Sequence, residues 1–400
     1  MTTTINNEHK KLNVPNSTDR GNVIRNVPAL RFPEFTEEWV NVSLKDVADF
    51  QKERISSGLL DESTYISTEN ILQNFQGVQS AISIPANTNV VAYKKNDILL
   101  SNIRPYLKKV WFSDKIGGCS ADVFVLRSKT CEPKFLYNVI ASDKFINYVM
   151  SGAKGVKMPR GDKNQMESFS FSIPAVAEQR KISRLFQLLD EKIATQNKII
   201  EDLKKLKSAI IEKLYSDIQG KEYSYRQLFE VINERNKQME YSNILAASQE
   251  KGMVNRDELN LDIQFERSNI DIYKIVRKGD YVIHLRSFQG GFAFSNMTGV
   301  CSPAYTILRP STLLEYGYLS YYFKSYRFIK SLIIVTYGIR DGRSISVEEW
   351  LNLKISIPSK EHQLHILKVL RSFDLKIENE ETYASCLSNQ KQYLLRQMFI

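Results

Sequence analysis

The sequence predicts an α+β protein in which two mixed α/β globular units are joined by two long antiparallel helices that form a coiled coil. Residues 174–218 carry a long heptad pattern of apolar side chains, and residues 358–400 repeat that pattern at the C-terminus. The globular segments that precede these two helices also match each other in many positions. The chain is therefore expected to be a tandem repeat with pseudo-two-fold symmetry.

The first long helix is predicted to begin at Pro174 and to end before Gly220. Proline suits a first helical turn because the N–H that it lacks has no intrahelical partner there, and glycine suits a helix end. In between, apolar residues recur at steps of four and three, which is the spacing of one long helix packed on another. The residues of this seam are Ile182, Phe186, Leu189, Ile193, Ile200, Leu203, Ile210 and Leu214.

The partner helix is expected in the same chain, at an offset of 184 residues that maps Ile173 onto Ile357. The offset also maps the polar interruptions of the seam, Gln196 and Lys207, onto Glu380 and Lys391. A chance heptad pattern would not repeat its own interruptions, so we interpret the match as a duplication. These polar positions are expected to set the register of the two helices. Identical pairs at this offset include Pro174 and Pro358, Gln179 and Gln363, Ile182 and Ile366, and Asp190 and Asp374.

The globular units are predicted to be built on one scaffold. In the first unit, apolar or alternating runs predict strands at residues 90–93, 98–100, 110–112 and 123–126, and helical spacing predicts a helix at residues 135–150. The second unit repeats the first at offsets of 181 to 183. The predicted organisation is an N-terminal arm at residues 1–25, globular units at 26–173 and 220–357, and long helices at 174–219 and 358–400.

Two segments break the repeat. Residues 55–89 and 236–273 scarcely match, although the helices and strand cores around them do. Surface segments tolerate such divergence while a scaffold is kept. The two units are therefore predicted to present two different recognition surfaces.

Composition favours a polyanionic partner and a reducing compartment. The net charge is +10 and the isoelectric point is about 9.1, which points first to nucleic acid. The four cysteines show no metal-ligand spacing, as is usual for a cytoplasmic protein. No apolar run is long enough for a membrane span, so no membrane partner is expected and a cytoplasmic location is predicted.

Together these features resemble the specificity subunit of a type I restriction–modification enzyme. The resemblance covers residues 26–400. It is carried by residues 173–190 and their echo at 357–374, by the opening Leu-Arg-Phe-Pro-Glu-Phe at 30–35, and by Asn-Ile-Arg-Pro at 102–105. The second unit departs from the pattern, because it lacks the Arg-Phe-Pro opening and has Ser287 where the first unit has Pro105.

The resemblance implies a DNA-recognition subunit without catalytic activity. Each globular unit would be a target recognition domain that reads one half of a split, asymmetric site on double-stranded DNA. The long helices would act as spacer and as dock for methyltransferase subunits, and restriction/translocase subunits would complete the complex. S-adenosylmethionine, ATP and magnesium would belong to those partners, and no cofactor or metal would be bound by this chain.

Two loops of each unit carry candidate DNA-binding residues. Just past a predicted strand, an arginine recurs at Arg104 and Arg286, and a guanidinium can bind a phosphate or the O6/N7 edge of guanine with paired donors. A glycine-rich basic loop at residues 151–161 recurs at 337–344, and glycine permits close approach to phosphate. The alternatives are a structural ion pair and a solvated loop. The candidates are Arg104, Lys108, Lys109, Lys154, Lys157, Arg160, Arg286, Arg340 and Arg343.

Other residues carry weaker signals. His362 and His365 have a spacing that suggests a metal, but their counterparts are Glu178 and Lys181 and no third ligand is evident, so no metal site is assigned. The sequence has no methyltransferase, Walker, nuclease or nucleophile-elbow motif, so no catalytic residue is assigned. Polar residues of the dissimilar segments are weaker candidates for base contacts: Tyr65, Ser67, Thr68, Gln249 and Arg256.

Two alternatives to DNA recognition remain open at this level. The first is a two-headed adaptor that binds proteins through its dissimilar surfaces. The second is an enzyme whose active site has no recognised motif. Salt-dependent binding distinguishes the first from a DNA-binding protein, and activity of the isolated chain would support the second.

Overall fold

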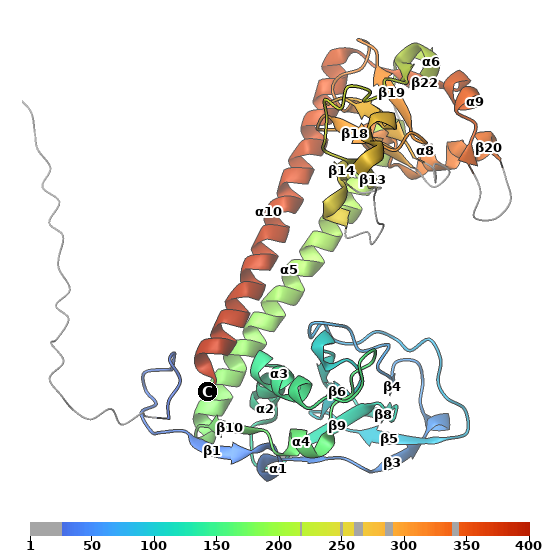
Figure 1. Cartoon of the computed structure of the whole chain (residues 1–400). Helices are drawn as coiled ribbons and strands as arrows, with labels where there is room; N and C mark the ends of the chain where they lie inside the picture. The colour runs from blue at the N-terminus through green and yellow to red at the C-terminus, as the bar shows by residue number, and fades with distance from the viewer. Residues whose placement is uncertain (1–25, 217, 249–250, 260–266, 285–290, 338–343) are drawn as a thin grey trace, which may run out of the picture. The chain divides into compact units, whose positions relative to one another are not determined.

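The computed structural model describes residues 26–216, 218–248, 251–259, 267–284, 291–337 and 344–400 (Figure 1). The predicted N-terminal arm at 1–25 lies outside these residues. The chain divides into two units, one formed by residues 1–192 with 387–400 and the other by 193–386. Two long helices, α5 (Val176–Ser216) and α10 (Lys360–Met398), contribute a segment to each unit.

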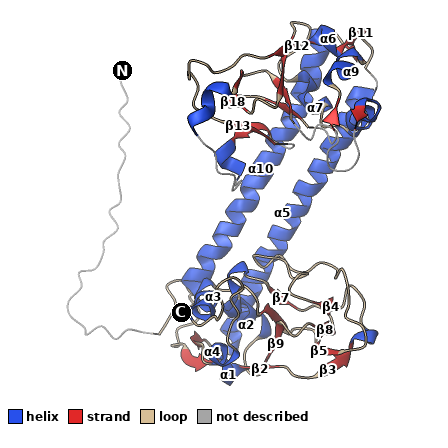
Figure 2. Cartoon of the chain, turned by 45° about the vertical axis from the view of Figure 1, so that its right-hand side comes forward, coloured by secondary structure: helices blue, strands red, loops and turns tan. Residues whose placement is uncertain are grey.

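The first unit contains two four-stranded sheets (Figure 2). The first sheet is antiparallel throughout, and the second pairs β4 with β8 in parallel and its other neighbours antiparallel. The predicted strands at 90–93, 98–100, 110–112 and 123–126 are confirmed. In spatial order, the first sheet is β2 (Ala48–Phe50), β9 (Val123–Ser128), β6 (Ile98–Ser101), β7 (Val110–Phe112), and the second is β3 (Arg54–Ser56), β5 (Asn89–Tyr93), β8 (Gly117–Cys119), β4 (Tyr65–Ile66).

The first sheet is buried on both faces, which explains its continuous apolar runs. In β6, Ile98 and Leu100 belong to the core shared with the long helices, whereas Leu99 belongs to the core shared with the second sheet. Neighbouring residues of a strand point to opposite faces, so one strand serves both cores. The strand β9 alternates in the same way, with Leu126 in one core and Val125 in the other.

Helices and a two-stranded ribbon complete the first unit. The helix predicted at 135–150 is wrong as a single element, because the structure has two helices that meet at Ser142. The Ser142 hydroxyl accepts a hydrogen bond from the Phe145 N–H at 3.2 Å and so caps a new helix. The helices are α1 (Leu44–Val47), α2 (Pro133–Ile140), α3 (Asp143–Ser151) and α4 (Lys163–Glu167), and the ribbon pairs β1 (Val40–Ser43) with β10 (Ser170–Ile173).

The second unit repeats the ribbon, the main sheet and the helices. Its main sheet is again antiparallel, and the ribbon pairs β11 (Lys221–Ser224) with β22 (Lys354–Ile357). The main sheet has the order β12 (Phe229–Ile232), β19 (Thr306–Pro310), β16 (Tyr281–Ile283), β17 (Phe292–Phe294). The helices are α6 (Tyr225–Leu228), α7 (Tyr318–Tyr322), α8 (Tyr326–Ser331) and α9 (Val347–Asn352).

The outer part of the second unit differs from its counterpart. Its described residues form two-stranded pairs, and single bridges of Arg235 with Lys274 and of Ile244 with Val300 stand where the first unit has the outer pairings of its four-stranded sheet. The divergence falls in the segment 236–273, where the repeat is weakest in sequence. The pairs of this outer part are β13 (Leu245–Ser248) with β14 (Gly252–Asn255) and β15 (Lys274–Val276) with β18 (Gly299–Cys301). A further pair, β20 (Thr336–Tyr337) with β21 (Ser344–Ile345), corresponds instead to the bridge between Lys154 and Arg160 in the first unit.

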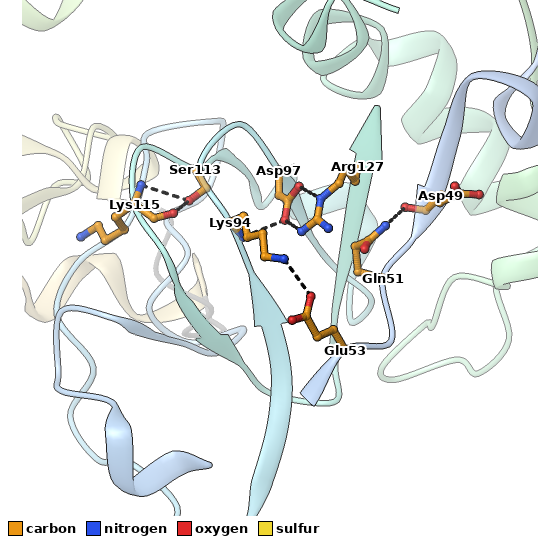
Figure 3. A network of polar contacts seen from close by, with 8 residues as sticks. All are labelled: Asp49, Gln51, Glu53, Lys94, Asp97, Ser113, Lys115 and Arg127. Atoms are coloured by element: carbon orange, nitrogen blue, oxygen red, sulfur yellow. Dashed lines mark hydrogen bonds and ion pairs between the residues drawn. The ribbon is translucent and has the colours of Figure 1, made fainter. Parts of the chain in front are cut away.

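A polar network at one end of the two central strands of the main sheet occurs in both units. In the first unit, the Arg127 guanidinium donates two hydrogen bonds of 2.7 Å to the buried Asp97 carboxylate, which also accepts from the Lys94 N–H (Figure 3). The second unit repeats the pair with Arg309 and Asp280, at 3.1 Å for both bonds. In each pair the hydrogen bond to the carboxylate raises the pKa of the arginine. A buried carboxylate requires such a partner, which explains why the repeat retains both residues.

The two long helices pack antiparallel within each unit. In the second unit, Lys207 of α5 is paired with Asp374 of α10, and the side chain of Gln196 donates to Glu380 further along. In the first unit, Lys391 of α10 lies 2.5 Å from Asp190 of α5. The 184-residue offset exchanges the two lysine–aspartate pairs and maps Gln196 onto Glu380. Of the predicted polar interruptions, Gln196 and Glu380 therefore pair with each other, whereas Lys207 and Lys391 each pair with an aspartate of the opposite helix.

A tyrosine of the globular part lies near each lysine–aspartate pair. In the second unit, the Tyr321 hydroxyl donates to Asp374 at 2.5 Å, and burial together with this carboxylate raises the pKa of Tyr321. In the first unit, burial and the nearby charge of Asp190 raise the pKa of Tyr137, which is Tyr321 minus 184. In the second unit the helix pair is thus hydrogen-bonded to the globular domain through Tyr321.

The opening of each long helix is held by a buried glutamine. The Gln179 side chain accepts a hydrogen bond from the Glu132 N–H at 2.8 Å and donates to the Pro174 carbonyl at 2.8 Å. The Gln363 side chain accepts from the Glu315 N–H and donates to the carbonyls of Leu313 and Pro358. One amide therefore joins the helix start to the domain that precedes it. Among the described residues, no helix combines the length and the apolar character that a membrane span requires.

We predict that Gln363→Leu lowers the free energy of unfolding by about 2–4 kcal/mol, because it leaves buried backbone groups without partners. Gln390→Leu, on the exposed side of the same helix, serves as the matched control and should change stability by less than about 0.5 kcal/mol. Urea denaturation of both variants tests this. Equal stability of the two variants would contradict the structural role of Gln363.

Candidate nucleic-acid interface

Two basic loops of the first unit lie side by side. One follows β6 and spans residues 102–109, and the other follows α3 and spans residues 152–161. The Arg104 N–H donates to the Pro159 carbonyl at 2.8 Å, and the Gly161 N–H donates to the Asn102 carbonyl at 3.1 Å. These bonds join segments that are about fifty residues apart in sequence. We call residues 102–109 and 152–161 the loop pair.

The first loop of the pair is a strained, well-defined turn. Its 3-10 helix, Pro105–Leu107, is flanked by Arg104 at φ 51° and Lys108 at φ 53°. The left-handed region costs a non-glycine residue on the order of 1–3 kcal/mol, so it persists only where surrounding contacts impose it. Here buried Pro105 and the backbone bond to Pro159 provide those contacts.

The loop pair contains two cations without a partner. Within the described residues, the exposed side chains of Arg104 and Lys157 have no hydrogen bond or ion pair. The remaining candidates of this unit are engaged. Lys108 lies 2.5 Å from Asp143, Lys109 donates to the Thr68 carbonyl at 2.6 Å, Lys154 lies 3.2 Å from Asp162, and Arg160 lies 2.7 Å from Asp122.

The engaged cations are held at the surface by weak pairs. Ion pairs exposed to water contribute little to stability, because solvent screens them. The Asp162 pKa is lowered chiefly by a hydrogen bond from the Gln165 N–H and then by Lys154. A phosphate could therefore displace the carboxylates from Lys154 and Arg160 at a small cost in free energy. Arg104 and Lys157 can bind a phosphate without losing an ion pair.

The sequence reasoning missed these carboxylate partners. Asp122 and Asp143 lie 38 and 35 residues away from the cations that they contact. No local pattern could have paired them. Asp162, eight residues from Lys154, is the one partner with a short-range signal.

The candidates of the second unit, Arg286, Arg340 and Arg343, lie outside the described residues. The described residues on either side of them are paired. The His284 N–H donates to the Gly291 carbonyl at 3.0 Å, and β20 pairs with β21. Each candidate segment therefore begins and ends at a closed backbone pair.

The weaker candidates do not gather into one site. Tyr65 is buried in β4, and Ser67 donates to Asn70 nearby. Gln249 lies outside the described residues, and Arg256 begins the 3-10 helix η3 (Arg256–Leu259). The described residues contain no cluster of three His, Cys, Asp or Glu side chains that could hold a metal.

Residues 36–205 match the type I restriction modification DNA specificity domain. The resemblance to type I specificity subunits that the sequence predicted is thereby confirmed. The matched segment contains the whole loop pair and residues 176–205 of α5.

Curated relatives carry the same description. The chain is 27% identical over 192 residues to the type I restriction enzyme MjaVIII specificity subunit of Methanocaldococcus jannaschii, covering 47% of this chain and 43% of the relative. It is 23% identical over 191 residues to the EcoDI specificity subunit of Escherichia coli, covering 46% and 43%. The chain thus spans about two-fifths of the length of the curated relatives it matches.

Solved structures share the fold. A chain described in terms of complex assembly and conformational transition of the type I R-M system is similar with a TM-score of 0.59 at 18% identity, covering 89% of this chain and 96% of that chain. The type I restriction-modification S subunit from M. genitalium is similar with a TM-score of 0.52 at 15% identity, covering 94% and 99%. The predicted fold class is confirmed.

The left-handed turn yields a direct test. We predict that Lys108→Gly is more stable than Lys108→Ala by roughly 0.5–1 kcal/mol, because glycine adopts a positive φ without a steric cost. Both variants lose the Asp143 pair, so that contribution cancels. At Lys109, whose φ is not positive, the order should reverse. Thermal unfolding of the four variants measures both differences.

Proposed function

We propose that this chain is the DNA sequence-recognition subunit of a type I restriction–modification complex, that it binds a bipartite asymmetric target, and that it catalyses no reaction itself. The observation that carries the proposal is the loop pair, which lies in the segment that matches the type I restriction modification DNA specificity domain. Each of its two loops presents one cation, Arg104 or Lys157, that has no partner among the described residues. Unpaired surface cations on a fixed frame suit the phosphate backbone of DNA.

Phosphate contacts and base contacts would have separate roles. Arg104 and Lys157 would position the domain on the duplex, and Lys154 and Arg160 would join them by leaving their carboxylates. Base edges in the groove would then be read by side chains that the phosphate contacts bring within reach. The second unit would act through Arg286, Arg340 and Arg343 in the same way.

A bipartite target is supported by the duplication and its exceptions. Both units keep the ribbon, the main sheet and the buried arginine–aspartate pair. They differ in the outer strands, within the segments 55–89 and 236–273. Two similar frames with unlike outer parts suit two half-sites of different sequence.

The helix pairs would dock methyltransferase subunits, and restriction/translocase subunits would join the assembled complex. S-adenosylmethionine, ATP and magnesium would act in those partners. Exposed apolar residues on the long helices, such as Leu188 and Ile199, support a partner-binding role for the outer helix faces. Methylation that depends on added partner subunits would support this assignment, whereas methylation by the isolated chain would contradict it.

We predict that the DNA affinity falls steeply as the salt concentration rises. Arg104→Ala and Lys157→Ala are each expected to make the negative slope of log K against log salt shallower by about 1. Lys95→Ala is the matched control, because Lys95 is exposed and precedes β6, whereas Arg104 follows it. Fluorescence anisotropy from 50 to 300 mM salt measures the slopes. If the affinity of the wild-type chain for DNA did not change with salt, the alternative of a protein-binding adaptor would be favoured instead.

We also predict that replacing residues 236–273 by the corresponding segment of another specificity subunit changes one half-site only. The segment contains the outer strands β13 and β14 but none of the main sheet. Mapping methylated adenines in a host that carries this gene and its partner genes reads out both half-sites. A change in both halves would refute the modular assignment.

A further inference from the structure

The loop pair also exposes apolar side chains. Val156 is fully exposed at the tip of the second loop, and Met158 beside it is 49% exposed. Tyr106, in the 3-10 turn of the first loop, is 48% exposed. Apolar side chains gathered on one exposed surface mark an interaction site more often than isolated ones do.

The charges around these side chains indicate which partner they meet. Val156 directly precedes Lys157, and Tyr106 follows Arg104 by two residues. Both of these cations lack a partner within the described residues. A surface that alternates unpaired cations with apolar groups is complementary to duplex DNA, where phosphates flank a groove that contains apolar methyl groups.

Both loops hold these side chains in a defined place. The backbones of Lys154 and Arg160 exchange hydrogen bonds of 3.0 and 2.9 Å, which close the second loop below Val156. Gly155 adopts φ +97°, a conformation that favours glycine and lets the chain turn at the tip. The first loop is fixed by its two left-handed residues.

The internal repeat preserves the same chemistry. An offset of 182 maps Tyr106 onto Phe288, and an offset of 183 maps Val156 onto Ile339. Residues close to them change, since Pro105 corresponds to Ser287. Two copies that diverged in neighbouring positions have thus both kept an aromatic residue two places after the arginine and a β-branched residue before the cation.

We propose that Tyr106 and Val156 read the DNA bases by apolar contact, and that the group they fit is the 5-methyl group of thymine in the major groove. This inference rests on the proposed function and assigns a different role within it. Arg104 and Lys157 bind phosphates irrespective of sequence, and Tyr106 and Val156 discriminate between base pairs. The thymine methyl is the apolar feature that the major groove offers to such side chains.

The test uses the full chain in complex with its methyltransferase partner and the half-site assigned to the first unit. Val156→Ala and Tyr106→Ala are each expected to weaken binding to cognate DNA five- to twentyfold, with unchanged binding to random DNA and an unchanged salt slope. Val40→Ala, at a position that is 64% exposed on the ribbon of the same unit, is the matched control and should behave as wild type. Thermal unfolding verifies that each variant is folded.

A second measurement alters the DNA instead of the protein. Replacing thymidine by deoxyuridine removes only the methyl group, and at one or more positions of the half-site it should weaken wild-type binding. At that position, deoxyuridine should not further weaken DNA binding by the Val156→Ala variant or by the Tyr106→Ala variant.

Equal losses on cognate and random DNA, or deoxyuridine substitutions that are all without effect, would overturn the inference and leave the phosphate contacts intact. Failure of the proposed function gives a different result, because the wild-type complex would then not prefer cognate DNA at all.

Discussion

A single buried amide at the start of each long helix is the contact on which the rest of the architecture depends. Gln179 and Gln363 each bind a backbone N–H of the preceding domain and a carbonyl at the helix entrance. A buried side-chain amide must satisfy both of its ends. The glutamine therefore fixes the position of each domain relative to the start of its own long helix. The basic loops are part of the domain, so their position depends on the same contact.

The two copies then diverge around the same contact. In the first unit, buried Glu178 receives two hydrogen bonds from Arg31, and Lys181 pairs with Glu34. Their counterparts are His362 and His365, which are exposed. The Arg-Phe-Pro-Glu opening of the first unit thus binds side chains that have no equivalent on the second long helix. This accounts for the absence of that opening from the second unit.

The positive charge that the loop pair presents to a partner depends on which of its cations already have an acceptor within the protein. Four of the six candidate cations in the first unit have a carboxylate or carbonyl partner, and two have none. Because all six are at least partly exposed, net charge alone cannot rank them. Arg104 and Lys157 differ from the other four because, within the described residues, no acceptor lies near their side chains. All of their hydrogen-bond donors are therefore available to a partner outside the chain.

The sequence by itself determined the duplication, the two long helices and the strands of the main sheet, because heptad spacing, repeated interruptions such as Gln196 and apolar alternation are local signals. It also located both basic loops. Only the tertiary structure decided that the helix at 135–150 breaks at Ser142, that the two loops are neighbours, and that Asp122 and Asp143 occupy Arg160 and Lys108. The loop contacts join residues 35 to 59 positions apart, and the helix break depends on one capping bond that outweighs helical spacing. Neither kind of contact has a signature in the local sequence.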